Sequence, residues 1–148
     1  MMAIPDNALT RRVIGCAIEV HRHLGPGLLE SGYEACLCDE LTVAGLPFVR
    51  QCSLPVRYKN RTLNQFFQMD MIVAEALVLE IKAVHLIHPL YEAQLLTYLR
   101  LSGLSLGLLL NFNAVRMTDG IRRLASSANG TGMARSALTV SHEAEGIA

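Results

Sequence analysis

The sequence predicts an α/β domain in which helices flank a mixed sheet of four strands. Three features of the apolar pattern lead to this fold class. Apolar residues recur every three or four positions over residues 7–44, alternate or run together over residues 48–84, and then mark one more helix and one more strand. The 148 residues fit a single domain, which we place at residues 7–125. Residues 126–148 are small, polar and aperiodic, so we expect a loose tail there.

Two helices are expected at the start of the chain. Residues 7–24 carry apolar side chains at helical spacing on one face, and a Gly-Pro-Gly sequence at residues 25–27 ends the pattern. A second helix is predicted over residues 28–44, because Gly45 follows the last periodic residue and favours a helix C-terminus. Both helices are expected to flank the sheet.

The middle of the chain predicts three strands. Residues 48–58 alternate apolar and polar side chains, as a strand with one solvated face does, and residues 62–73 should return as its hairpin partner. Residues 76–84 are mostly apolar on both faces, which is typical of a central strand. The remaining elements are predicted to be a helix at 89–101, a buried strand at 105–112 and a short terminal helix at 118–124.

The chain carries no net charge, because thirteen Lys and Arg residues balance thirteen Asp and Glu residues. This balance counts against a nucleic-acid enzyme, since phosphate binding usually leaves an excess of cations. Local basic clusters weaken that objection. Among them, Arg57, Lys59 and Arg61 are expected at a hairpin tip, either as a solvated turn or as an arm that contacts a phosphate backbone.

The composition also points to a compartment. The four cysteines form no CxxC pair, and free thiols in a reducing compartment are the simplest interpretation. The first residues lack the continuous hydrophobic segment of a secretory signal, and the most apolar run, residues 104–110, is too short to cross a bilayer. We therefore expect a cytoplasmic protein that does not associate with membranes.

The strand at residues 76–84 carries charged side chains where a core strand should have none. Its period of two places Val78, Glu80 and Lys82 on one face. Ionised groups on a buried strand are unfavourable unless they are paired or bind a ligand. Taken alone, this pattern fits a structural ion pair between Glu80 and Lys82 as well as a functional site.

Asp70 adds a second carboxylate from the preceding strand. In an antiparallel hairpin with a short turn at Ala74 and Glu75, Asp70 would lie near Glu80. Two carboxylates in an apolar setting repel each other unless a proton or a metal ion lies between them. Ligands that are all oxygen favour Mg²⁺ or Mn²⁺ over zinc. Lys82 would then act on a metal-bound water or stabilise the charge of a phosphate transition state.

Residues of two helices are expected to complete this site. Glu30 shares a helical stripe with Tyr33, which indicates either a site acid or an acid favoured by the helix dipole. In the later helix, Tyr91, Gln94 and Tyr98 lie at three- and four-residue spacing. Such a face suits stacking and hydrogen bonding to a nucleotide, although the edge of a core has the same pattern.

Together these residues resemble a known family. The segments that carry the resemblance are Gly27-Leu-Leu-Glu30-Ser-Gly-Tyr33, Asp70, Glu80-Ile-Lys82 and Gln94-Leu-Leu-Thr-Tyr98, and they are similar to the GxxExxY protein family. That family is assigned to the PD-(D/E)xK nuclease superfamily, near its RecB-like branch. The resemblance covers about residues 9–124 and implies a restriction-endonuclease-like core.

The resemblance also implies roles for single residues. Asp70 and Glu80 would be metal ligands and Lys82 the catalytic lysine. Glu30 would be the acid that the helix contributes to catalysis and metal binding, and the backbone carbonyl of Ile81 would join the metal shell. In the later helix, Gln94 and Tyr98 would match the QxxxY element that RecB-like nucleases place beside the site.

We therefore expect a Mg²⁺- or Mn²⁺-dependent nuclease that hydrolyses phosphodiester bonds through a metal-activated water. Tyr33, Tyr91, Gln94 and Tyr98 are the expected substrate contacts. DNA is expected before RNA as the partner, and a homodimer is compatible with the sequence. The alternative is a non-catalytic module that keeps the fold and binds nucleic acid or protein. A weaker alternative makes Lys82 a Schiff-base lysine, but adjacent acids would keep it protonated.

Overall fold

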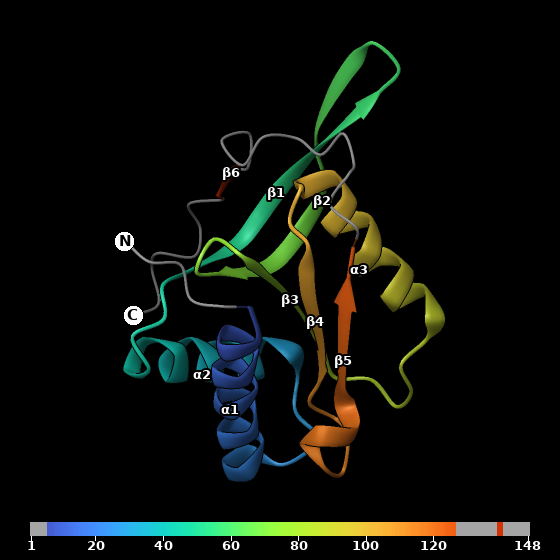
Figure 1. Cartoon of the computed structure of the whole chain (residues 1–148). Helices are drawn as coiled ribbons and strands as arrows, with labels where there is room; N and C mark the ends of the chain where they lie inside the picture. The colour runs from blue at the N-terminus through green and yellow to red at the C-terminus, as the bar shows by residue number, and fades with distance from the viewer. Residues whose placement is uncertain (1–5, 127–138, 141–148) are drawn as a thin grey trace.

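The computed structural model describes residues 6–126 and 139–140, and its architecture is the predicted α/β fold (Figure 1). Helices and strands follow each other in the predicted order up to residue 111. In chain order the elements are α1 (Asp6–Leu24), α2 (Glu30–Val43), β1 (Phe48–Tyr58), β2 (Arg61–Val73), β3 (Leu77–Lys82), α3 (Pro89–Ser102), β4 (Leu106–Asn111), the 3₁₀ helix η1 (Met117–Gly120), β5 (Ile121–Ala125) and β6 (Thr139–Val140). Within the described part of the chain, no helix is both long and apolar enough to cross a membrane.

The strands form one mixed sheet of six strands in the order β5-β4-β3-β2-β1-β6. β1, β2 and β3 form an antiparallel meander, β4 runs parallel to β3, and β5 returns antiparallel to β4. The mixed sheet was predicted, but with four strands instead of six. Both additional strands, β5 and β6, lie at the edges of the sheet. They have five and two residues, which is too few for a clear alternation of apolar and polar side chains.

The predicted terminal helix at residues 118–124 is wrong. Residues Met117–Gly120 form one 3₁₀ turn, and Ile121–Ala125 then forms β5 on the outer edge of β4. All residues of β4 are buried, so its backbone N–H and C=O groups need partners on both sides. β3 supplies backbone hydrogen-bond partners on one side of β4, and β5 supplies them on the other. This pairing outweighs the helix-like spacing of Ile121 and Leu124.

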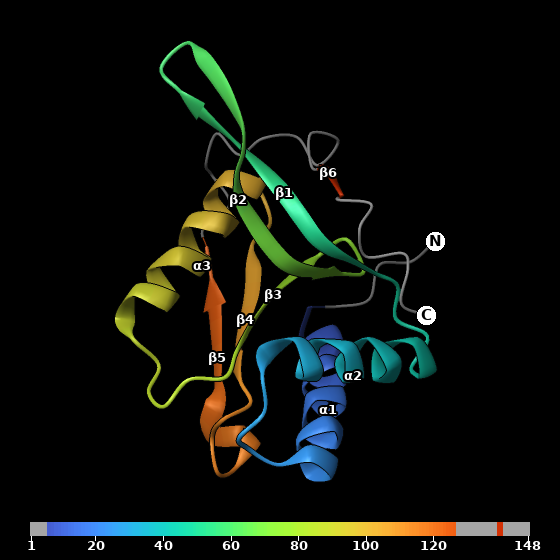
Figure 2. The same cartoon turned by 180° about the vertical axis from the view of Figure 1, so that it is seen from behind.

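Helices cover both faces of the sheet, and the two views of the molecule show α1 and α2 on one side and α3 on the other (Figures 1 and 2). Two apolar clusters result. Leu79 and Ile81 of β3 pack in the cluster that contains residues of α1 and α2, whereas Val78 packs in the cluster that contains residues of α3. β3 is therefore buried on both faces, as its sequence predicts.

The predicted tail after residue 125 lies outside the described residues, except for Ser126 and for Thr139–Val140. The latter form β6 and pair antiparallel with Cys52 and Ser53 of β1. All four cysteines are free thiols, as expected, and Cys16, Cys38 and Cys52 are buried.

Candidate functional site

The β2–β3 hairpin brings Asp70 and Glu80 together. The last backbone pair between the two strands is Met71 with Leu79, and the same register places Asp70 opposite Glu80 one step further. The turn that fixes this register is tight, with Ala74 and Glu75 at φ 52° and 57° and the Ala76 N–H donating to the Val73 carbonyl at 3.0 Å. Two successive residues with positive φ are the signature of the hairpin turn that matches strand twist.

At Asp70 and Glu80, backbone N–H groups donate to side-chain carboxylates instead of to backbone carbonyls of the opposite strand. The Ile81 N–H donates to Oδ2 of Asp70 at 2.7 Å, and the Asp70 N–H donates to Oε1 of Glu80 at 3.3 Å. Each carboxylate is thus bound to the backbone of the opposite strand. The strand pairing itself fixes the positions of both acids, without help from a flexible loop.

Both acids are held in an unfavourable electrostatic environment. Glu80 is only 4 % exposed and Asp70 is half-buried. Burial raises the pKa of Asp70, opposed by the Ile81 hydrogen bond, and burial together with the charge of Asp70 raises the pKa of Glu80. None of the ion pairs among the described residues includes either acid. The pair therefore lacks a close cation.

Lys82 lies two residues beyond Glu80 at the end of β3 and is half-buried. Its Nζ is 4.6 Å from the centroid of the Tyr91 ring, a distance at which a cation is attracted to the ring face. Its charge still lowers the pKa values of Asp70 and Glu80. Tyr91 thus orients the ammonium group beside the acidic pair, without the close ion pair that would neutralise it.

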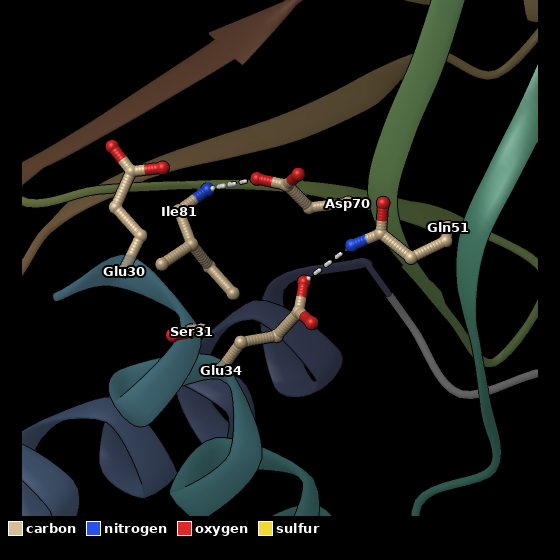
Figure 3. Close-up of a pocket in the computed structure, with 6 residues that line it drawn as sticks. All are labelled: Glu30, Ser31, Glu34, Gln51, Asp70 and Ile81. Atoms are coloured by element: carbon tan, nitrogen blue, oxygen red, sulfur yellow. Dashed lines mark hydrogen bonds between the residues drawn. The ribbon is translucent and has the colours of Figure 1, made fainter. Parts of the chain in front are cut away.

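Helix α2 closes a pocket of about 300 Å³ over this part of the sheet (Figure 3). Figure 3 shows the Asp70 carboxylate projecting from the sheet and the Glu34 carboxylate from the helix on the opposite side of the pocket. The residues that line the pocket are Glu30, Ser31, Glu34, Gln51, Asp70 and Ile81.

Glu30 lines this pocket, but it is exposed, so its expected place on a buried stripe is wrong. The reason is that α2 begins at Glu30 itself, so its side chain lies at the helix end, where the Ala83 N–H donates to Oε1 at 3.4 Å. The buried acid of the helix is Glu34, one turn further on. Sequence reasoning missed Glu34, although its three-residue spacing to Leu37 placed it on the apolar face.

Two residues of β1 hold Glu34. NH2 of Arg50 donates to Oε2 at 2.6 Å, and Nε2 of Gln51 donates to Oε1 at 2.9 Å. Neighbouring strand residues normally point to opposite faces, but Gln51 has φ 50°. This left-handed residue interrupts the alternation and lets both side chains reach the same carboxylate. The charge of Glu34 in turn helps to raise the pKa of Asp70.

Tyr33 takes a structural role in place of the expected substrate contact. Its side chain is fully buried and its ring stacks on Phe112 with the centroids 4.7 Å apart. Its hydroxyl donates to the Gly25 carbonyl at 2.6 Å and accepts from the Leu28 N–H at 3.2 Å. Tyr33 therefore shapes the loop that leads into α2.

We expect Tyr33→Phe to lower the free energy of unfolding by about 1 kcal/mol, because it deletes the hydrogen bonds of one hydroxyl and keeps the ring. The turnover of any substrate should not change. Chemical denaturation and a steady-state assay check the two parts. A reduced rate at unchanged stability would return Tyr33 to the list of substrate contacts.

Helix α3 brings its tyrosines to the opposite side of the carboxylate pair. Tyr98 is 4 % exposed, its ring meets Phe67 edge-on at 6.0 Å, and burial with the charges of Glu80 and Asp70 raises its pKa to about 12. Tyr91 lies against Lys82, and Gln94, between the two tyrosines in sequence, is half-buried. The predicted α3 face thus reaches both the acids and the lysine.

The donor atoms at this site suit a hard divalent cation. Asp70 and Glu80 supply carboxylate oxygens, and the carbonyl of Ile81 lies between Glu80 and Lys82 along β3. Within the described residues, no group of three or more His, Cys, Asp or Glu side chains could hold a metal alone. Zinc usually requires such a set, whereas Mg²⁺ binds one or two carboxylates and keeps waters or substrate phosphates. The residues present therefore fit Mg²⁺ or Mn²⁺.

Comparison with known proteins gives one match. A family model described as PD-(D/E)XK nuclease superfamily matches residues 7–124, which is most of the chain. No curated protein and no solved structure matches the chain.

Proposed function

Because the chain belongs to the PD-(D/E)XK nuclease superfamily, we propose that it is a nuclease that uses Mg²⁺ or Mn²⁺ to hydrolyse phosphodiester bonds of nucleic acid. Nucleases of this superfamily generally use divalent metals, and their substrates are nucleic acids. The observation that carries the proposal is the Asp70–Glu80 pair, a half-buried and a buried acid with raised pKa values and no close cation. A divalent cation would relieve their repulsion and satisfy both carboxylates.

Each residue of the proposed centre has its own task. Asp70, Glu80 and the Ile81 carbonyl would hold the cation, which supplies Lewis-acid chemistry for the hydrolysis of a phosphodiester. Lys82 would stabilise negative charge on the reacting phosphate, because its ammonium group lies beside the acids without a close ion pair. Tyr91 would be a positioning residue that keeps the ammonium group there.

The remaining residues predicted for the site would contact the substrate or the outer metal shell. Glu30 is the exposed acid at the pocket, so it would bind solvent around the cation or join a second metal position. Gln94 and Tyr98 would contact the nucleotide from α3. Because Tyr98 is buried, only a small part of its side chain would take part in this contact.

Several finer assignments belong to this proposal. The Gly27–Tyr33 motif supports the GxxExxY family, and Gln94 with Tyr98 supports the RecB-like branch. The family match to residues 7–124 supports one nuclease domain at residues 7–125. The free cysteines support a reducing compartment such as the cytoplasm. DNA as the substrate and a homodimeric state complete the proposal.

Divalent-metal titration by calorimetry tests the centre directly. Mn²⁺ should bind the parent protein, and the Asp70→Asn/Glu80→Gln variant should lose this binding because each amide removes one anionic ligand. Glu75→Gln is the matched control, since Glu75 is an exposed acid in the turn between the same two strands.

A screen of DNA and RNA substrates with Mg²⁺ and Mn²⁺ would follow. Metal binding and cleavage that disappear together in the double variant support the nuclease. If the parent neither binds Mn²⁺ in the presence of DNA nor cleaves any substrate, the alternative of a non-catalytic binding module replaces it.

A further inference from the structure

The end of the β1–β2 hairpin projects beyond the rest of the sheet (Figures 1 and 2). We call residues 56–64 the hairpin arm. β3 pairs only with residues 71–73 of β2, and β6 pairs only with Cys52 and Ser53 of β1. Within the described part of the chain, the two strands of the arm therefore have only each other as backbone partners. Such a ribbon is free to lie against another molecule.

A bend separates the arm from the sheet. The register of β1 and β2 shifts between Leu54 and Val56. Pro55 lies at the shift and has no N–H to donate to the ladder. Below this point, Leu54 belongs to the apolar cluster that contains residues of α3, and Phe67 packs against that cluster, so the base of the arm is anchored in the core. Irregularities of this kind bend and twist a strand pair.

The hairpin arm carries positive charge only, although the chain as a whole is neutral. Arg57, Lys59 and Arg61 are all exposed, and residues 54–69 include no Asp or Glu. The ion pairs among the described residues include none of the three cations. Three cations without counter-charges on a two-stranded ribbon are the pattern of a surface for polyanions.

The arm also presents its cations on both sides of the tip. Arg57 pairs with Thr62 and Tyr58 with Arg61, so Lys59 and Asn60 form the turn between them. Lys59 lies 5.5 Å from the centroid of the Tyr58 ring, which is 52 % exposed. A cation held over an aromatic ring has fewer conformations to lose on binding.

The spacing between the arm and the acidic pair fits a double helix. Arg61 and Asp70 lie on the same strand, nine residues apart. At about 3.3 Å per residue this is a reach of up to about 30 Å. A duplex advances about 3.4 Å per base pair, so the arm would meet a duplex up to about nine base pairs from the site.

We propose that the hairpin arm binds the phosphate backbone of a DNA duplex whose cleavage site lies at Asp70 and Glu80. The proposal rests on the proposed nuclease function for the choice of partner. It adds that affinity and substrate length are set outside the pocket, by cations that contact phosphates without reading base sequence. The overall neutral charge of the chain is then compatible with a nucleic-acid substrate.

The test measures binding of the full chain to a fluorescein-labelled DNA duplex of about 30 base pairs, long enough to span both regions. EDTA keeps cleavage out of the measurement. The arm variant is Arg57→Gln/Lys59→Gln/Arg61→Gln. The control is Arg11→Gln/Arg22→Gln/Arg116→Gln, which removes the same charge from exposed residues on α1 and before η1, at the opposite end of the molecule (Figure 1). Thermal unfolding verifies that both variants are folded.

The arm variant should bind at least about ten-fold more weakly near 0.1 M salt, and its plot of log affinity against log salt should flatten by about 0.9 for each lost phosphate contact. The control variant should stay within about two-fold of the parent. Equal losses in the two variants, or a weaker affinity with an unchanged salt slope, would overturn the proposal.

A second readout separates this proposal from the nuclease proposal. With bis(p-nitrophenyl) phosphate, a phosphodiester too small to reach the arm, the arm variant should match the rate of the parent. If the parent shows no cleavage at all, while the arm variant still loses affinity for the duplex, the nuclease proposal fails and the arm remains a binding surface. If the parent and the arm variant bind the duplex with equal affinity, the arm proposal fails whatever the catalytic result.

Discussion

Glu80→Gln should abolish cleavage and, at the same time, make the metal-free protein more stable. Glu80 is buried and faces Asp70, so its ionised form is unfavourable in the fold. Glutamine is neutral and nearly isosteric, and its carbonyl oxygen can still accept from the Asp70 N–H. We expect the free energy of unfolding at neutral pH to rise by about 1 to 2 kcal/mol. The loss of one anionic metal ligand should lower cleavage about a thousand-fold or more.

The same residue predicts how stability depends on pH. Because the fold raises the pKa of Glu80, its contribution to stability is complete below the ordinary pKa of glutamate and is lost as the pH rises through the raised value. Metal-free protein should therefore become less stable from acid toward neutral and alkaline pH. Glu80→Gln should flatten this decline, and Mn²⁺ should flatten it in the parent.

Urea denaturation at several pH values, in EDTA for the metal-free proteins and with Mn²⁺ for the parent, measures stability, and a nuclease assay measures activity. Glu75→Gln is again the control, since its exposed carboxylate should change neither stability nor rate. A less stable, inactive Glu80→Gln variant would indicate a purely structural carboxylate. An active variant would remove Glu80 from the proposed metal centre. A substitution that raises the stability of the fold while it lowers activity is typical of a residue that serves function at a cost in stability.

Arg50→Met should destabilise the protein by about 2 to 4 kcal/mol, the second large effect that the structure predicts. Glu34 and Arg50 form an ion pair whose side chains are 11 % and 20 % exposed. The hydrogen bond from Arg50 to Glu34 raises the pKa of the arginine, so the pair favours the charged guanidinium. Methionine fills a similar volume, but it leaves the Glu34 carboxylate with Gln51 alone and near the charge of Asp70.

A double-mutant cycle isolates this interaction. Glu34→Met/Arg50→Met should recover much of the stability that Arg50→Met loses, because no unpaired charge is then left in the core. Arg116→Met is the control, since its pair with Asp119 is exposed and should contribute little. Additive losses in the cycle would show that the two side chains stabilise the fold independently. The measurement is again the free energy of unfolding in urea.

The elements that build the proposed metal centre can be predicted from local patterns in the sequence. The alternation of β1, the apolar run of β3 and the short turn at Ala74 and Glu75 are local signals, and they suffice to place Asp70 opposite Glu80. A period of two excludes registers shifted by one residue, and the tight turn selects among those that remain, so this contact could be predicted without a structure. The face of α3 that carries Tyr91 and Tyr98 was predictable for the same reason, from helical periodicity.

The other features depend on contacts between residues that are distant in the sequence, so local patterns do not specify them. β5 is a strand because the buried edge of β4 needs hydrogen-bond partners, although its own five residues favour no such structure. Tyr33 belongs to the core because Phe112 and the Gly25 carbonyl complete its surroundings. Glu34 became the buried acid of α2 because Arg50 and Gln51 both reach it, which the left-handed backbone of Gln51 in β1 allows. Periodicity states which residues share a face, but burial and pairing depend on what the fold places against that face.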